Sequence, residues 1–226
     1  MDHPFWHNRW ENNQIGFHLD QPNPYLIDNA CLIESKDNNV FVPLCGKSLD
    51  MVWLSQQGWN VTGVEISEIA INDFFSENNL PFKKQGRGLL PAYSSNSIKL
   101  FQGDFFNLTS QHLNKCCSFF DRAALIAMPK DMRIQYASHF ASIMPARSKG
   151  LLVTVSYTPT QSEHPPFSVS QEEVLELYSR CFTVEKLSSH DIMEAYPKAR
   201  ERGLTQIHET VYFLKRKPEK EDYSSL

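Results

Sequence analysis

The chain has 226 residues, a length that suits one large domain or two very small ones. Its 22 basic and 26 acidic residues give a formal net charge of −4, so it lacks the overall positive field that attracts nucleic acid or an anionic membrane surface. Hydrophobic residues make up 41% and charged residues 21%, which is typical of a folded chain. We therefore expect a single domain over residues 1–217, a flexible tail at 218–226 and no nucleic-acid partner.

The five cysteines favour a reducing environment. They are odd in number, they show no C-x-x-C spacing, and Cys116 and Cys117 are adjacent, which suits an ordinary disulfide poorly. No stretch approaches the roughly 18 to 20 apolar residues of a membrane span, and the N-terminus lacks a basic region followed by an apolar one. We expect a cytoplasmic protein without a membrane partner, and a monomer because no heptad seam is present.

Apolar runs bounded by turn residues alternate with segments of helical spacing, which is typical of a mostly parallel α/β sheet with helices on both faces. Helices are predicted from Ser48 to about Gly58, from Ser67, and from Ser170, where Glu173 completes a capping box. No strongly amphipathic helix separates the last two runs, so we expect an antiparallel closing pair there. The seven predicted strands are Val40–Leu44, Asn60–Glu65, Ile98–Gly103, Ser118–Arg122, Leu151–Tyr157, Phe182–Leu187 and His208–Lys215.

The turn after the first strand has the pattern of a nucleotide site. Gly46 lets a ligand approach the backbone, and Glu65, at the end of the second strand, is an acid that can accept hydrogen bonds from both ribose hydroxyls. A phosphate-binding P-loop is excluded because it requires glycine where this chain has Phe41, and a dinucleotide fingerprint is disfavoured because Leu44 and Ser48 flank a single glycine. The remaining ligand class is a nucleoside without phosphates, and S-adenosylmethionine is the commonest such cofactor on this topology. The alternative is that Gly46 only closes an ordinary turn and that Glu65 is a solvated strand end.

Five motifs then occur in one order: Phe5-Trp6-His7-x-Arg9-Trp10, Ile15-Gly16-Phe17-His18, Pro43-Leu44-Cys45-Gly46-Lys47-Ser48, Gly63-Val64-Glu65-Ile66-Ser67 and Asp121-Arg122-Ala123-Ala124-Leu125. With them the chain, from about Phe5 to Lys215, resembles the bacterial-type thiopurine S-methyltransferase family. The resemblance implies a Rossmann-like class I methyltransferase fold, with a seven-stranded, mostly parallel sheet and an antiparallel last strand. It also implies S-adenosyl-L-methionine as cofactor, S-adenosyl-L-homocysteine as product and a small-molecule thiol as substrate.

The resemblance assigns the cofactor contacts. Trp6 and Trp10 are four residues apart, so on a helix they share a face and would roof the cofactor as part of a lid over about residues 1–25; ordinary core packing is the alternative. Asp104 and Phe105 would meet the adenine, the acid accepting from its amine and the ring stacking on it, unless they form a simple turn. The predicted cofactor-binding residues are Trp6, Trp10, Leu44, Gly46, Glu65, Asp104, Phe105 and Arg122.

Arg122 is the main catalytic candidate. It ends the fourth predicted strand inside an apolar run, so its burial demands a partner, and an internal pair with Asp121 is the alternative to an active-site role. The resemblance places Phe17 against the acceptor ring; the adjacent His18 is a weak candidate for a base. Arg200 is predicted as a second catalytic basic residue, with Lys198 and Arg202 as competing choices, and the loop over residues 158–167 is expected to shape the acceptor pocket.

The expected reaction is an in-line displacement in which an acceptor sulfur attacks the sulfonium methyl group. Selenium or tellurium species are alternative acceptors, a non-catalytic nucleoside-binding sensor is an alternative use of the same pocket, and a nicotinamide oxidoreductase is a third possibility that the single glycine disfavours. His3 and His7 are four apart, but Pro4 lies between them and no further ligand has matching spacing, so no metal site is expected.

Overall fold

The computed structural model describes residues 3–113, 115–159, 162, 164–196, 199–201 and 203–218. One nine-stranded sheet runs through this part of the chain in the order β3-β4-β5-β2-β1-β6-β7-β9-β8. Its parallel centre consists of β1 (Asn39–Val42), β2 (Asn60–Glu65), β5 (Ile98–Gln102), β6 (Ser118–Arg122) and β7 (Lys149–Thr158). The two strands at the middle of this group, β1 and β6, are short and nearly all buried, as expected where helices cover both faces of a parallel sheet.

The closing strands run antiparallel, as predicted. β9 (Gln206–Arg216) inserts between β7 and β8 (Phe182–Asp191), and it pairs antiparallel with both. When only the seven predicted strands are numbered, their spatial order is 3-2-1-4-5-7-6. The α/β class and the mixed sheet with an antiparallel last strand are therefore confirmed.

The strand count of seven is wrong because two short strands extend the sheet. β3 (Lys83–Gln85) and β4 (Ala92–Ser95) form an antiparallel pair, and β4 also pairs antiparallel with β5. All three residues of β3 are exposed, so this edge strand carries no apolar alternation from which the sequence could reveal it.

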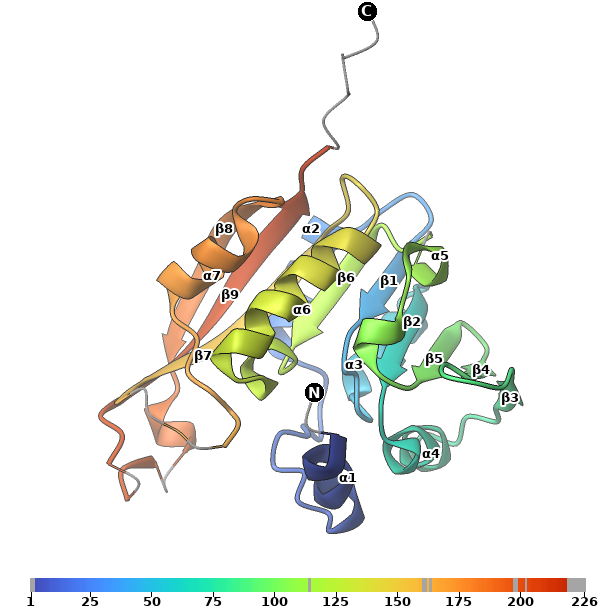
Figure 1. Ribbon diagram of the computed structural model, residues 1–226, viewed down its shortest axis with the longest axis horizontal. Helices are drawn as coiled ribbons and strands as arrows, with labels where there is room; N and C mark the ends of the chain where they lie inside the picture. Colours follow the sequence, from blue (N-terminus) through green and yellow to red (C-terminus); the bar gives the residue numbers. More distant parts are fainter. Residues whose placement is uncertain are drawn as a thin grey trace, which may run out of the picture.

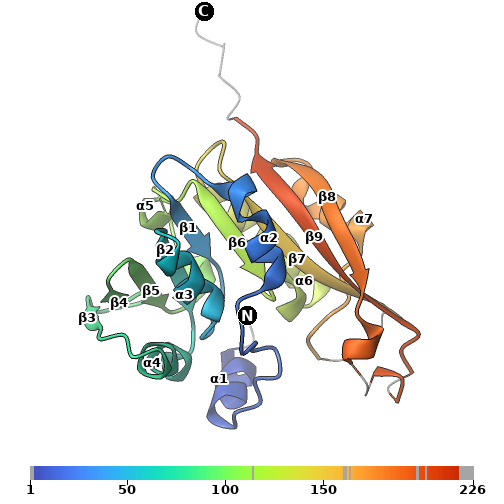
Figure 2. The ribbon, with the colours of Figure 1, turned by 180° about the vertical axis from the view of Figure 1, so that it is seen from behind.

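Helices pack on both faces of the sheet (Figures 1 and 2). The short α5 (Ser110–Leu113), α6 (Lys130–Ile143) and α7 (Gln171–Tyr178) bury apolar side chains in one cluster, and α2 (Pro24–Ile33), α3 (Leu49–Gln56) and α4 (Glu68–Glu77) do so in the other. Helix α1 (His3–Glu11) lies apart from both layers, beyond the carboxyl ends of β1 and β6 (Figure 1). Among the described residues, none of the helices combines the length and apolar character that crossing a bilayer requires.

The predicted helix starts are confirmed by their caps. The side chains of Ser48, Ser67 and Ser170 each accept a hydrogen bond from a backbone N–H in the first turn of α3, α4 and α7. Helix α2 was not predicted from the sequence, although Asn23 caps it and Pro24 occupies its first turn. The turns before α3 and α4 lie at the carboxyl ends of β1 and β2. Because these strands are parallel neighbours, the two turns lie close together on the same side of the sheet.

Candidate active site

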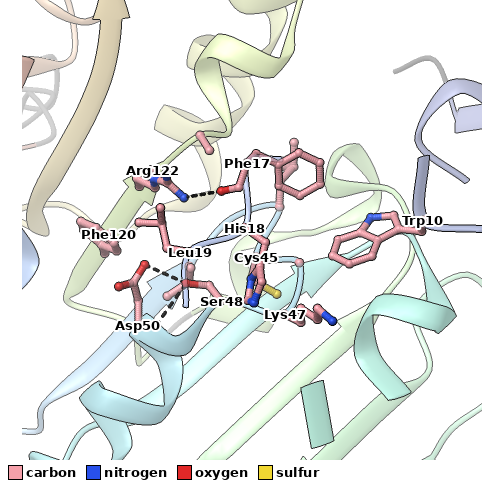
Figure 3. Close-up of a pocket in the computed structure, with 14 residues that line it drawn as sticks. Trp10, Phe17, His18, Leu19, Cys45, Lys47, Ser48, Asp50, Phe120 and Arg122 are labelled. Carbon is pink, nitrogen blue, oxygen red and sulfur yellow. Dashed lines mark hydrogen bonds between the residues drawn. The ribbon is translucent and has the colours of Figure 1, made fainter. Parts of the chain in front are cut away.

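A hollow open to solvent, of about 450 Å³, lies at the carboxyl ends of β1 and β6. Its walls come from α1, from the segment 17–19, from the turn after β1, from the start of α3 and from the end of β6 (Figure 3). Clefts outside the carboxyl ends of parallel strands are the usual ligand sites of such sheets, and this hollow lies at that position.

The turn after β1 is held in a strained backbone conformation. Leu44 has a φ of 43° and Gly46 a φ of 51°, and the facing Ala123, after β6, has a φ of 66°. Two of these residues are not glycine, and such strain persists only where surrounding structure imposes it, often at ligand sites. A Cβ at Gly46 would lie 3.1 Å from the ring of Trp10, so the glycine also lets that indole close over the turn.

Glu65, at the end of β2, is buried behind this turn. Its two carboxylate oxygens accept hydrogen bonds from the backbone N–H groups of Gly46, at 2.9 Å, and Ser67, at 2.8 Å. Burial raises the pKa of the carboxyl, while these two hydrogen bonds act in the opposite direction. The alternative in which Glu65 is a solvated strand end is wrong, because the side chain is 6% exposed.

Helix α1 contributes Trp10 to the wall of the hollow and also contacts the turn after β5. The rings of Trp6 and Trp10 both meet the ring of Phe17 edge-on, with centroids 5.7 Å and 5.6 Å away. The predicted shared helix face is therefore confirmed, although Trp6 does not line the hollow itself. At the helix start, the imidazole of His3 hydrogen-bonds the carboxylate of Asp104 over 2.7 Å, which ties α1 to the turn after β5.

Arg122 ends β6 at the wall of the hollow. One terminal nitrogen of its guanidinium donates to the backbone carbonyl of Phe17 over 2.8 Å (Figure 3). The alternative of an internal pair with Asp121 is wrong, because successive strand residues point to opposite faces and Asp121 accepts from the Tyr136 hydroxyl at 2.7 Å. The positive charge of Arg122 instead acts on the pKa of Glu209 from β9, opposing the increase that burial causes there.

Three polar residues of the hollow were given little or no weight by sequence reasoning. Lys47 is 8% exposed and pairs with Glu77 over 2.6 Å. Asp50 is buried and accepts from the backbone N–H of Asn23 at 2.6 Å and from the hydroxyl of Ser48. The half-buried His18, weighed only as a lone histidine, lines the same wall. Lys47 follows the motif glycine directly, which is the signal that could have singled it out.

Other predicted residues are not brought to the hollow. The ring of Phe105 is 1% exposed and packs against Phe41 and Tyr136, so its expected stacking on an adenine is replaced by core packing. Asp104 uses one oxygen for His3 and the other for the backbone N–H of the short helix that follows it. Arg200 is exposed and is not among the residues that line the hollow, while Lys198 and Arg202 lie outside the described residues.

Comparison with known sequences gives one consistent result. Residues 1–217 match the family described as Thiopurine S-methyltransferase. A thiopurine S-methyltransferase of Pseudomonas paraeruginosa is 49% identical over 218 residues, which cover 96% of this chain and 100% of the relative. A thiopurine S-methyltransferase of Shewanella loihica is 40% identical over 218 residues, with the same shares of 96% and 100%.

Solved structures share the fold at low sequence identity. A SAM-dependent methyltransferase from Anabaena variabilis superposes with a TM-score of 0.65 at 12% identity, covering 95% of both chains. The 1,6-didemethyltoxoflavin-N1-methyltransferase of Burkholderia thailandensis, solved with 1,6-didemethyltoxoflavin and S-adenosylhomocysteine, superposes with a TM-score of 0.64 at 11% identity, covering 95% of this chain and 87% of that one. Both likenesses support the Rossmann-like methyltransferase fold.

Proposed function

The chain belongs to the thiopurine S-methyltransferase family, and from that premise we propose that it transfers the methyl group of S-adenosylmethionine to the sulfur of an aromatic or heterocyclic thiol, such as a thiopurine. Its family makes the protein an S-adenosylmethionine-dependent methyltransferase; the thiol acceptor and the roles of individual residues are the proposal. The observation that carries the proposal is that Arg122, Trp10 and Phe17 line one hollow beside the glycine turn. The Arg122 guanidinium donates to the Phe17 carbonyl, and the rings of Trp10 and Phe17 contact each other.

The residues around the turn fit the cofactor. Gly46 has no side chain to block a ligand, and Trp10 lies over it. Both oxygens of Glu65 already accept a backbone N–H, and a carboxylate has about four acceptor positions, which leaves it capacity for a ribose hydroxyl. When bound, S-adenosylmethionine supplies a methyl group on a positively charged sulfur. We assign Leu44, Gly46 and Glu65 to its binding, with Trp6 and Trp10 excluding water from above.

Arg122 is the residue proposed to hold the acceptor. Its guanidinium donates one N–H to the carbonyl of Phe17, and within the described residues its other donors make no hydrogen bond, so that they are available to an anionic sulfur. Aromatic heterocyclic thiols are substantially ionised near neutral pH, so for them the protein mainly has to orient two reactants. The Phe17 ring, fixed by its contacts with both tryptophans, is proposed to pack on the acceptor ring. Arg200, exposed and away from the hollow, stays a prediction that carries none of this proposal.

The test combines binding and turnover in one preparation. Calorimetric titration with S-adenosylhomocysteine measures the cofactor site, and transfer of a radiolabelled methyl group to an aromatic thiol measures the reaction. Arg122→Ala should lower kcat/KM by about 100-fold, the typical loss when one preorganised donor to a developing or resident anion is removed. Arg87→Ala, an exposed arginine near β3, is the matched control. Binding without transfer to any aromatic thiol would contradict the proposed acceptor, and a selenol tested in parallel identifies the alternative class.

A further inference from the structure

His18 stands out among the residues that line the hollow. It follows Phe17 directly, and its half-buried imidazole lies between the Arg122 and Lys47 sides of the hollow (Figure 3). Its backbone N–H donates to the carbonyl of Ile15, but within the described part of the chain its ring nitrogens have no hydrogen-bond partner. A ring nitrogen that faces a ligand hollow without a protein partner is available to a bound molecule.

The charges around His18 come from several elements. Lys47, from the turn after β1, and Arg122, from the end of β6, face it as cations; Glu77 of α4, Asp20 of its own segment and Asp50 of α3 face it as carboxylates. Burial and the Lys47 charge lower the pKa of His18, while Glu77 and Asp20 act in the opposite direction. A neutral imidazole at pH 7 can accept a proton, which a protonated one cannot.

The other ionisable groups of the hollow do not suit this role. The guanidinium of Arg122 has N–H donors and no acceptor atom. Lys47 is a cation held by Glu77. Asp50 already binds a backbone N–H and a hydroxyl, and burial raises the pKa of the Cys45 thiol, so that this group stays protonated. Among the described residues that line the hollow, His18 is the side chain left to take a proton.

We propose that His18 accepts the proton of the acceptor's S–H group, so that the enzyme also methylates thiols that are not ionised at neutral pH. The inference rests on the proposed function. In the step, the S–H bond breaks and the proton moves to a ring nitrogen of His18, while the acceptor sulfur uses its electron pair to bond the donor's methyl carbon. The bond between that methyl group and the donor sulfur breaks, and its pair stays on the donor sulfur, which becomes neutral. The imidazolium then returns its proton to water.

The acceptor's own pKa provides the kinetic test. If His18→Gln removes the proton acceptor, the rate should follow the thiolate fraction, which at pH 7 is about one thirtieth for a thiol of pKa about 8.5. The variant should therefore lose about 30-fold in kcat/KM with an alkyl thiol of that acidity, and little with an aromatic thiol ionised at pH 7. Added imidazole should restore part of the activity of His18→Ala. An equal loss with both thiols would indicate a structural role and overturn the proposal.

A readout without turnover uses S-adenosylhomocysteine, which cannot donate a methyl group. A thiophenol absorbs at different wavelengths as thiol and as thiolate, so its ionisation can be titrated with pH in the complex of enzyme, S-adenosylhomocysteine and thiophenol. The wild-type complex should hold thiolate at lower pH than the His18→Gln complex. His112→Gln is the matched control, because His112 lies on α5 and hydrogen-bonds the backbone of Thr109.

The outcomes separate the two proposals. If the wild-type enzyme methylates aromatic thiols while His18→Gln titrates and reacts as the wild type does, the role of His18 is refuted and the proposed function stands. If the wild-type enzyme binds S-adenosylhomocysteine but methylates no thiol, the proposed function fails before the variant is considered. Binding of S-adenosylhomocysteine by His18→Gln, measured by calorimetry, shows that the variant is folded and its cofactor site intact.

Discussion

Replacing Asp121 by asparagine should remove a pH dependence from the free energy of unfolding. Asp121 lies on β6 with its side chain 2% exposed, it accepts from the Tyr136 hydroxyl, and burial raises its pKa from 3.8 to about 7. Because the folded state binds this proton more tightly than the unfolded state, the contribution to stability is fully present below pH 4 and is lost as the pH rises through 7. The wild-type protein therefore carries an unfavourable buried charge at alkaline pH that Asp121→Asn does not.

The size of the effect follows from the two pKa values. A difference between 3.8 and about 7 corresponds to about 4 kcal/mol at high pH, of which about 2 to 3 kcal/mol is lost between pH 5 and pH 8. Burial also raises the pKa values of Asp50, Glu65 and Glu209, so the wild-type curve alone does not isolate Asp121. The quantity to compare is the difference between wild type and variant at each pH.

Urea unfolding at a series of pH values from 5 to 8 measures this difference directly. The stability of Asp121→Asn relative to the wild type should increase by about 2 to 3 kcal/mol across the range. Asp131→Asn, at an exposed position in the first turn of α6, controls for the loss of one negative charge. If the wild-type and Asp121→Asn curves run parallel from pH 5 to pH 8, the carboxyl has the same affinity for protons in both states and the reasoning is refuted.

Two further changes test the N-terminal helix and the turn beneath it. Gly46→Ala should weaken S-adenosylhomocysteine binding by about tenfold or more. The added Cβ would lie 3.1 Å from the Trp10 ring, and the φ of +51° strains an alanine by about 1 kcal/mol or more. Calorimetry measures the change in Kd, and an unchanged Kd would show that the indole moves freely. His3→Ala should leave overall stability within about 1 kcal/mol, because the side chain is 40% exposed, yet it should speed amide hydrogen exchange in α1; exchange unchanged there would mean that the Asp104 contact does not hold the helix.

Much of the central fold could be predicted from local patterns. The strands β1, β2 and β6 are apolar runs bounded by turn residues, and Ser48, Ser67 and Ser170 mark helix starts that their side chains cap. Capping depends on contacts within one turn, so the letters suffice. By contrast, β3 is held by pairing with β4 and has no apolar alternation of its own, and only the tertiary structure reveals it.

Some features of the candidate site could likewise be predicted from the sequence, and others could not. The sequence by itself determined that a glycine turn follows one strand and that an acid and an arginine end two others, because each of these residues sits at a predictable distance from an apolar run. Only the tertiary structure decided that Arg122 turns away from Asp121 to the Phe17 carbonyl, that Phe105 packs in the core, and that His18 faces the hollow. The direction of a side chain at the end of a strand or in a loop depends on what packs against it. Those neighbours come from distant parts of the chain, and local spacing does not encode them.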